Sequence, residues 1–245
     1  MAIGVRVRQI LQGLLFPQCC VLCDQWTVNA HFSPLCRPCL ASLPRMASGI
    51  CLCCGLPLPA NPRNSHTVCS LCRQNQKPFD RARSWGPYQG TLRTLIHKFK
   101  FHGYRRLAYP LSDLLVGCCR EDLNITPDWI IPVPLHPERE KERGFDQTRL
   151  LARELSRTLS IPLFWGLSRV RNTLPLTGLD PSGRRRTLRR AFTLVDEPAL
   201  EGGELLVIDD VMTTGATASE ICRLLHEQTR VKGISIMTLA RVLSS

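Results

Sequence analysis

The sequence predicts an α/β fold, a Rossmann-like parallel sheet with a small cysteine-rich module at its N-terminal side, on three observations. Short runs of branched apolar residues, such as 205–208, are typical of strands buried in a parallel sheet. Polar loops and segments with apolar residues at helical spacing follow these runs. Ten of the 13 cysteines precede residue 73, which indicates a separate module.

The cysteine-rich module is expected over residues 19–73, after a short amphipathic helix over 1–18. It contains four Cys-x-x-Cys pairs, and a two-residue spacer lets one tight turn aim two sulfurs at a single ion. Zinc prefers four thiolates in a tetrahedron, so four pairs predict two structural zinc sites, a double zinc ribbon. The predicted ligands are Cys20, Cys23, Cys36, Cys39, Cys51, Cys54, Cys69 and Cys72.

The pairing of these cysteines has two alternatives. Sequential ribbons use the first two pairs for one zinc and the last two for the other. The intervals between pairs are slightly short of the usual ribbon range, which leaves interleaved pairing open. Disulfides or a redox role are the weaker alternative, because four such pairs fit neither a single redox centre nor a reducing compartment.

The formal charge of +12 suggests an anionic partner. Two zinc tetrathiolate sites would bring this value to roughly +8, which is still basic. Phosphate substrates, nucleic acid and solubility all fit such a surface. No apolar run is long enough to span a membrane, and the apolar stretch after Arg8 is interrupted and lacks a small-residue cleavage site. A cytoplasmic protein is expected.

A polar linker, 74–80, leads to the larger domain, expected over 81–245. The patterns predict, in order, a strand over 83–88, a helix over 90–101 ended by Gly103, a helix over 107–118 and a strand over 129–134. A highly charged loop, 135–145, then leads to Asp146, which is expected to cap a helix carrying Leu150, Leu151 and Leu155. The Arg-rich segment 173–192 is expected to form a flap, and the last strand is expected over 234–241.

The segment between them, 207–217, reads VIDDVMTTGAT. A strand is expected to end at Asp209 and Asp210, and the loop from Thr213 to Thr217 lies at the start of a predicted helix. Free backbone N–H groups and the helix dipole suit a phosphate there, and Gly215 lets the backbone approach it. Two adjacent carboxylates can accept hydrogen bonds from vicinal hydroxyls. Ribose 5-phosphate presents both groups, whereas the Gly-Lys-Ser/Thr ending of a P-loop is absent.

This segment resembles the phosphoribosyl pyrophosphate (PRPP) motif of type I phosphoribosyltransferases. The resemblance implies that Asp209 and Asp210 bind the ribose hydroxyls. It implies a 5-phosphate cradle formed by Val211, Thr213, Thr214, Gly215, Ala216 and Thr217.

The whole chain resembles the ComF family. The motifs that carry the resemblance are the four cysteine pairs, Tyr88-x-Gly90, Lys100-Phe101, 132–134 (PVP), 143–147 (RGFDQ) and the PRPP motif. The resemblance implies a type I phosphoribosyltransferase fold behind a double zinc ribbon, and a link to competence, the uptake or processing of transforming DNA. Asp146, Leu176 and Thr187 depart from the family pattern, and the last two put recognition of an acceptor in doubt.

By this resemblance the leading hypothesis is Mg²⁺-dependent use of PRPP. Lys100, Arg139, Lys141 and Arg143 are expected near the pyrophosphate, with Mg²⁺ held mainly by substrate oxygens. The alternative is a protein without turnover, which senses PRPP or a phosphorylated nucleotide or binds single-stranded DNA. Its zinc ribbons would dock a helicase or recombination partner, or would be purely structural. Aromatic residues such as Phe101 and Trp165 are expected in the core or pocket.

Overall fold

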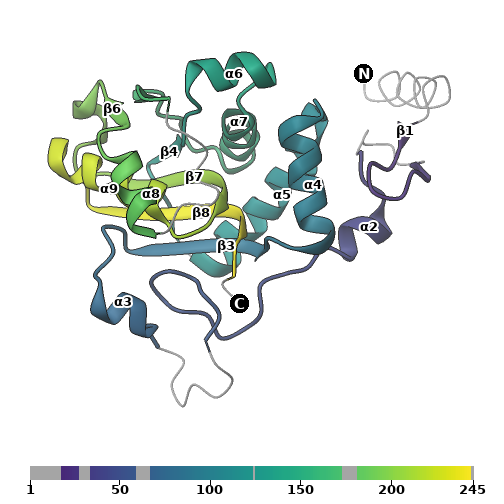
Figure 1. Ribbon diagram of the computed structural model, residues 1–245, viewed down its shortest axis with the longest axis horizontal. Coiled ribbons are helices and arrows are strands. Elements are labelled where there is room, and N and C mark those ends of the chain that lie inside the picture. Colours follow the sequence, from purple (N-terminus) through teal and green to yellow (C-terminus); the bar gives the residue numbers. More distant parts are fainter. Residues whose placement is uncertain (1–17, 28–33, 59–66, 124, 173–180, 244–245) are drawn as a thin grey trace.

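The computed structural model describes residues 18–27, 34–58, 67–123, 125–172 and 181–243. The expected helix over 1–18 and Leu176 lie outside these residues, apart from Gln18. At the centre is a four-stranded, all-parallel sheet with the strand order β3-β8-β7-β4 (Figure 1). Its strands are β3 (Arg81–Pro87), β4 (Trp129–Pro132), β7 (Glu204–Met212) and β8 (Gly233–Arg241). The predicted α/β class with a parallel sheet is confirmed.

Helices cover both faces of this sheet, and the alternation of side chains along β7 shows how. Leu206 and Ile208 pack into a cluster with α4, α5 and α7, whereas Leu205 and Val207 pack into a second cluster with α9. The helices are α4 (Gly90–Phe101), α5 (Ala108–Cys118), α7 (Gln147–Leu159) and α9 (Ala216–Gln228). Three layers result, with the sheet in the middle.

Short elements complete the described chain. In the cysteine-rich part these are β1 (Gln18–Cys19), β2 (Trp26–Thr27), α2 (Arg37–Ala41) and α3 (Ser70–Gln74). Around the sheet these are the 3₁₀ turn η1 (Arg105–Leu107), the π turn η2 (Cys119–Leu123), α6 (Pro137–Arg143), β5 (Leu167–Arg169), α8 (Pro181–Leu188), β6 (Phe192–Leu194) and the 3₁₀ turn η3 (Glu197–Leu200). In the described part of the chain, no helix has the length and apolar character needed to cross a membrane.

The segment 135–145, predicted as a loop, contains the helix α6, so that prediction is wrong. His136 caps the helix through Nδ1, which accepts a hydrogen bond from the Glu138 amide at 3.3 Å, and Pro137 occupies the first turn. Acidic residues in the first turn and basic residues in the last turn complement the helix dipole. Gly144 ends the helix with a φ of +75°. Caps and charges thus form this helix without an apolar stripe.

Candidate functional site

A small, partly open pocket lies at the carboxyl end of β7. It is lined by Asp209, by Thr238 on the neighbouring strand β8, and by most of the segment 211–218. The rest of the lining is apolar and consists of Val133, Val207 and Ile236. The pocket therefore brings one of the two acids together with the loop that was predicted to hold a phosphate.

The loop 213–215 turns the chain from β7 into α9. Gly215 has a φ of +78°, and a Cβ atom at this position would lie 2.8 Å from the Met212 Cε atom, so the turn favours glycine. No side chain caps α9 at Gly215, and its first turn carries no acid. The Thr214 hydroxyl oxygen is buried and has no hydrogen-bond partner among the described residues. An anion bound at this helix start would supply the acceptor that the hydroxyl lacks.

Asp209 and Asp210 lie inside β7, because the strand continues to Met212 through its pairing with β8. The strand therefore continues past Asp209 and Asp210, where its end was predicted, and that prediction is wrong. Successive side chains of a strand point to opposite faces, and the two acids have different surroundings. Asp209 lines the pocket. Asp210 is buried, and its Oδ1 atom lies 2.7 Å from the Lys100 Nζ atom at the end of α4.

The second carboxylate oxygen of Asp210 belongs to a network that joins four elements. It accepts a hydrogen bond of 2.7 Å from Gln147 Nε2, and Gln147 Oε1 in turn accepts one of 2.9 Å from Arg143 Nη1. The Arg143 guanidinium lies 4.8 Å from the centre of the Phe101 ring. The network therefore connects α4, α6, α7 and β7 beside the pocket. Gln147 had no predicted role of its own.

The four cations predicted for the pyrophosphate have three different positions. Lys100 and Arg143 belong to the network around Asp210. Arg139 is half-buried and is close enough to Arg143 and Arg169 to lower the pKa of both guanidiniums. Lys141 is exposed to solvent on α6, outside this network.

Asp146 caps α7 as predicted, and this cap fixes Gln147. The Asp146 Oδ1 atom accepts hydrogen bonds from the amides of Thr148 and Arg149 at 2.9 and 3.0 Å. Its Oδ2 atom accepts a hydrogen bond of 3.1 Å from the amide of Leu135, which lies in the loop that follows β4. One buried carboxylate therefore ties the start of α7 to the loop after β4.

A small two-stranded antiparallel sheet, β5 with β6, flanks the site and carries Arg169. Arg169 is half-buried, its guanidinium lies 5.6 Å from the centre of the Phe192 ring, and its charge acts on Asp209. Sequence reasoning missed this residue. Of the predicted Arg-rich flap, residues 181–188 form α8, which packs against α9, and Arg189 and Arg190 are exposed.

Electrostatics distinguish the two acids further. Burial, and then the adjacent charge of Asp210, raise the pKa of Asp209 to about 7, against the opposing effects of Lys100 and Arg169. Burial lowers the pKa values of Arg143 and Arg169. The pocket thus has an acid that changes its charge near neutral pH, next to several cations.

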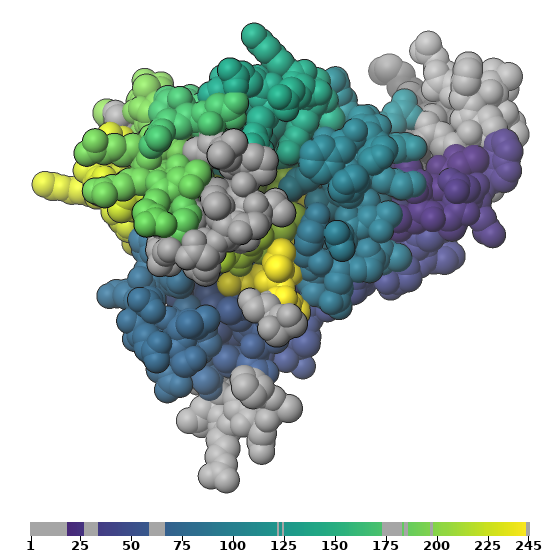
Figure 2. Space-filling view, in the orientation of Figure 1, coloured from purple at the N-terminus to yellow at the C-terminus, as the bar shows by residue number. Residues whose placement is uncertain are grey.

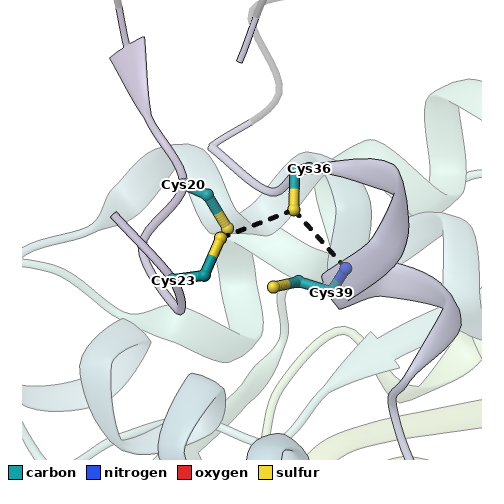
Figure 3. Close-up of side chains that lie close together, drawn as sticks. All are labelled: Cys20, Cys23, Cys36 and Cys39. Atoms are coloured by element: carbon teal, nitrogen blue, oxygen red, sulfur yellow. Dashed lines mark hydrogen bonds between the residues drawn. The ribbon is translucent and has the colours of Figure 1, made fainter. Parts of the chain in front are cut away.

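The eight predicted cysteine ligands form two groups, in which all sulfurs lie within 4.8 Å of one another. The first cysteine group is Cys20, Cys23, Cys36 and Cys39 (Figure 3), and the second cysteine group is Cys51, Cys54, Cys69 and Cys72. Pairing is therefore sequential rather than interleaved.

The sulfur geometry of both groups is compatible with zinc. The Sγ atoms of Cys23 and Cys36 are 3.7 Å apart, and those of Cys54 and Cys69 are 3.8 Å apart. A tetrahedron of sulfurs about 2.3 Å from zinc has edges of about 3.8 Å. The Cys39 amide donates a hydrogen bond to Cys36 Sγ at 3.4 Å, an arrangement that orients a thiolate ligand.

The two cysteine groups pack on different parts of the sheet domain. The first group lies beside α4, where Lys98 Nζ donates a hydrogen bond of 2.6 Å to the Val21 carbonyl. The second group lies against β3, where the Ala82 amide donates a bond of 2.7 Å to the Cys53 carbonyl. Figure 2 shows the two groups, in purple and blue, at separate edges of the molecule. Their contacts to the rest of the chain fit a structural role.

No family model matches the chain. DNA utilization protein YhgH of Escherichia coli O157:H7 is 36% identical over 219 residues, which cover 86% of this chain and 92% of that protein. Competence protein F of Haemophilus influenzae is 32% identical over 225 residues, with 86% and 98% covered. Competence protein ComFC of Bacillus subtilis is 27% identical over 249 residues, with 91% and 94% covered.

Among solved structures, an allosteric regulatory enzyme of purine biosynthesis superposes with a TM-score of 0.41 at 17% identity, covering 58% of this chain and 30% of that chain. That likeness is too weak to support an inference about function.

Proposed function

Because the chain belongs to the ComF family of competence and DNA-utilization proteins, we propose that it binds PRPP, or a nucleotide with the same ribose 5-phosphate group, in the pocket at the end of β7. The observation that carries the proposal is the loop 213–215, which starts α9 without a side-chain cap and holds the unpaired, buried Thr214 hydroxyl. Asp209 lines the same pocket.

Each part of the ligand has a matching part of the site. The 5-phosphate would accept hydrogen bonds from the amides at the start of α9 and from the hydroxyls of Thr213, Thr214 and Thr217. Asp209 would accept hydrogen bonds from the ribose hydroxyls. Lys100 and Arg143 would face the pyrophosphate, and Lys100 is paired with Asp210 in the structure. An anion that binds Lys100 therefore competes with this ion pair.

Mg²⁺ would reach the site with PRPP and neutralise part of its charge, held mainly by phosphate oxygens and water. Departure of pyrophosphate leaves positive charge on the ribose ring. The cations around the site stabilise the leaving group, and Asp209 in its charged form stabilises the ring. These residues would support pentosyl transfer if an acceptor is bound, whereas a sensor needs only the binding step.

The test is calorimetric titration of Mg-PRPP into the wild type and the double variant Asp209→Asn/Asp210→Asn, followed by a pyrophosphate-release assay. The control variant Glu121→Gln/Glu227→Gln removes the same two charges from exposed ion pairs. We expect binding in the wild type and control and none in the double variant. Equal binding by all three proteins would refute the site. Pyrophosphate release separates an enzyme from a sensor.

A second candidate function is binding of single-stranded DNA, which the names of the relatives also suggest. The observation that favours it is a row of rings at the end of α4. Phe101, expected in the core or pocket, is 56% exposed and therefore not in the core, and its ring centre lies 4.8 Å from that of His97. Tyr104 is 42% exposed, and Lys98 Nζ lies 5.9 Å from its ring centre. Trp165, also expected in the core or pocket, is 43% exposed. Exposed rings next to cations suit stacked bases.

The DNA test is fluorescence anisotropy with a labelled oligonucleotide over a series of salt concentrations. Phe101→Ala should weaken binding, whereas Tyr109→Ala, which removes an equally exposed ring from α5, should not. Affinity that is absent at physiological salt would exclude this function. The cysteine groups, which pack on the sheet domain of this chain, would in addition dock a helicase or recombination partner.

A further inference from the structure

Arg241, the last residue of β8, lies between the second cysteine group and the proposed ribose-phosphate loop. Its side chain is buried, and Nη1 donates a hydrogen bond of 2.7 Å to the carbonyl of Cys54, one of the four cysteines of the second group. The same nitrogen lies 2.9 Å from the Met212 sulfur. One guanidinium thus contacts a ligand residue and the residue that precedes Thr213.

The contact continues from Met212 into the loop. The Met212 Cε atom lies 2.8 Å from the position that a Cβ atom of Gly215 would take, so this side chain packs directly on the left-handed turn. The Met212 backbone is also held by the end of β8, because the amide of Val242, the residue after Arg241, donates a hydrogen bond of 2.9 Å to the Met212 carbonyl. Cys54, Arg241, Met212 and Gly215 therefore form one chain of contacts.

We propose that Arg241 is a positioning residue that couples the second cysteine group to the loop 213–215, so that metal binding by the cysteines and anion binding by the loop strengthen each other. The part that concerns the anion rests on the proposed function. Zinc with four thiolates carries two net negative charges, which favour a buried guanidinium beside the group. When zinc is bound, the second cysteine group fixes the Arg241 side chain, and Arg241 keeps Met212 packed against the turn at Gly215. Coupling of this kind is reciprocal by thermodynamic necessity.

The matched control for Arg241 is Arg83. This residue is also buried and also binds the second group, since its Nη1 atom donates a bond of 3.0 Å to the Leu52 carbonyl. It lies on β3, however, which β8 separates from β7. Variants of Arg83 and Arg241 should therefore both weaken zinc binding, and only those of Arg241 should disturb the loop.

The first experiment measures zinc affinity by competition with a chelator and hydrogen exchange of the amides of 209–217. Arg241→Met should weaken zinc binding about tenfold and speed exchange in 209–217 even when zinc is saturating. Arg241→Lys should fall between it and the wild type, and Arg83→Met should change zinc affinity alone. Exchange in 209–217 that is the same in Arg241→Met and the wild type would overturn the proposal. This readout needs no ligand, so it stands apart from the test of PRPP binding.

The second experiment compares equivalent ligands of the two cysteine groups. Cys36 and Cys69 each precede a short helix. Cys69→Ser should speed exchange in 209–217 and lower the affinity for Mg-PRPP about tenfold, whereas Cys36→Ser should leave exchange in 209–217 unchanged. An equal effect of both variants on this segment would refute the coupling through Arg241. If Cys69→Ser does not fold, the zinc-saturated Arg241→Met protein decides the question.

Discussion

The ion pair between Lys100 and Asp210 allows a worked prediction for Asp210→Asn. The side chains are 16% and 7% exposed, so the pair is closer to a buried ion pair than to a surface one. Removing one partner of a buried pair costs about 3–5 kcal/mol of stability, whereas a surface pair is worth about 0–1 kcal/mol. The partial exposure of Lys100 lowers the expected cost, and we predict about 3 kcal/mol.

The hydrogen bonds of the network support this value. The amide group of Asn would place an N–H donor opposite Gln147 Nε2, which now donates to Asp210. Turning the Gln147 amide by half a rotation would restore that bond but would remove the acceptor of Arg143. Either arrangement leaves a buried polar group without a partner, at a cost of about 1–3 kcal/mol.

The assay is urea unfolding of the zinc-bound protein, followed by circular dichroism. With a slope of about 2 kcal/mol per molar urea, Asp210→Asn should lower the midpoint by about 1.5 M. Glu121→Gln, which breaks an exposed ion pair with Arg45, should lower it by less than about 0.5 M. In the double variant Lys100→Met/Asp210→Asn, the two costs should not add, with a coupling of about 2 kcal/mol. Additive costs within 0.5 kcal/mol, a tolerance on the order of experimental error, would refute the reasoning.

Three further predictions concern the pH response, the loop and the metal. The pKa of Asp209 is about 7 in the folded protein and about 4 when unfolded, so its contribution to stability is complete below pH 4 and is lost as the pH rises through 7. Urea midpoints of the wild type should therefore fall between pH 5 and 8 relative to those of Asp209→Asn, and parallel curves would contradict the raised pKa. Gly215→Ala should cost about 1–2 kcal/mol and weaken Mg-PRPP binding, because φ is +78° and Met212 must move. Gly117→Ala, in the last turn of α5 with nothing within 4 Å of the new Cβ, should instead stabilise the protein by up to about 1 kcal/mol in the same assay. Metal analysis should find two zinc ions per chain, and one in Cys36→Ser and in Cys69→Ser; two ions in either variant would contradict the ligand assignment.

Periodic patterns predicted the parts of the fold in which burial determines structure. The helix 90–101 begins and ends where the apolar spacing and Gly103 indicate, since its apolar face must be buried. The cysteine pairs gave both four-cysteine groups because metal geometry constrains their spacing. The pairing of the groups needed the structure, because both orders of pairing satisfy the same spacing.

Other features depend on interactions that a sequence pattern does not contain. The helix α6 was predicted as a loop because its stability comes from caps and charges rather than from an apolar stripe. Arg169 carries no motif and reaches the site only because β5 pairs with β6. Phe101 was expected in the core or pocket as an aromatic residue, yet it is the last residue of α4 and is exposed.

The pairing of β3 with β8 means that β3 is synthesised well before the strand with which it pairs. Ser84 on β3 bonds Thr238 on β8, 154 residues later. At about 5–20 residues per second, the ribosome needs on the order of 8–30 s to supply this partner. The ligands of the second cysteine group, by contrast, span only 51–72 and are complete before β3 is made. Zinc can therefore bind the second cysteine group, next to β3 in the sequence, before β8 has been synthesised. Zinc starvation should then lower the yield of newly folded protein more than it lowers the stability of protein that has already folded.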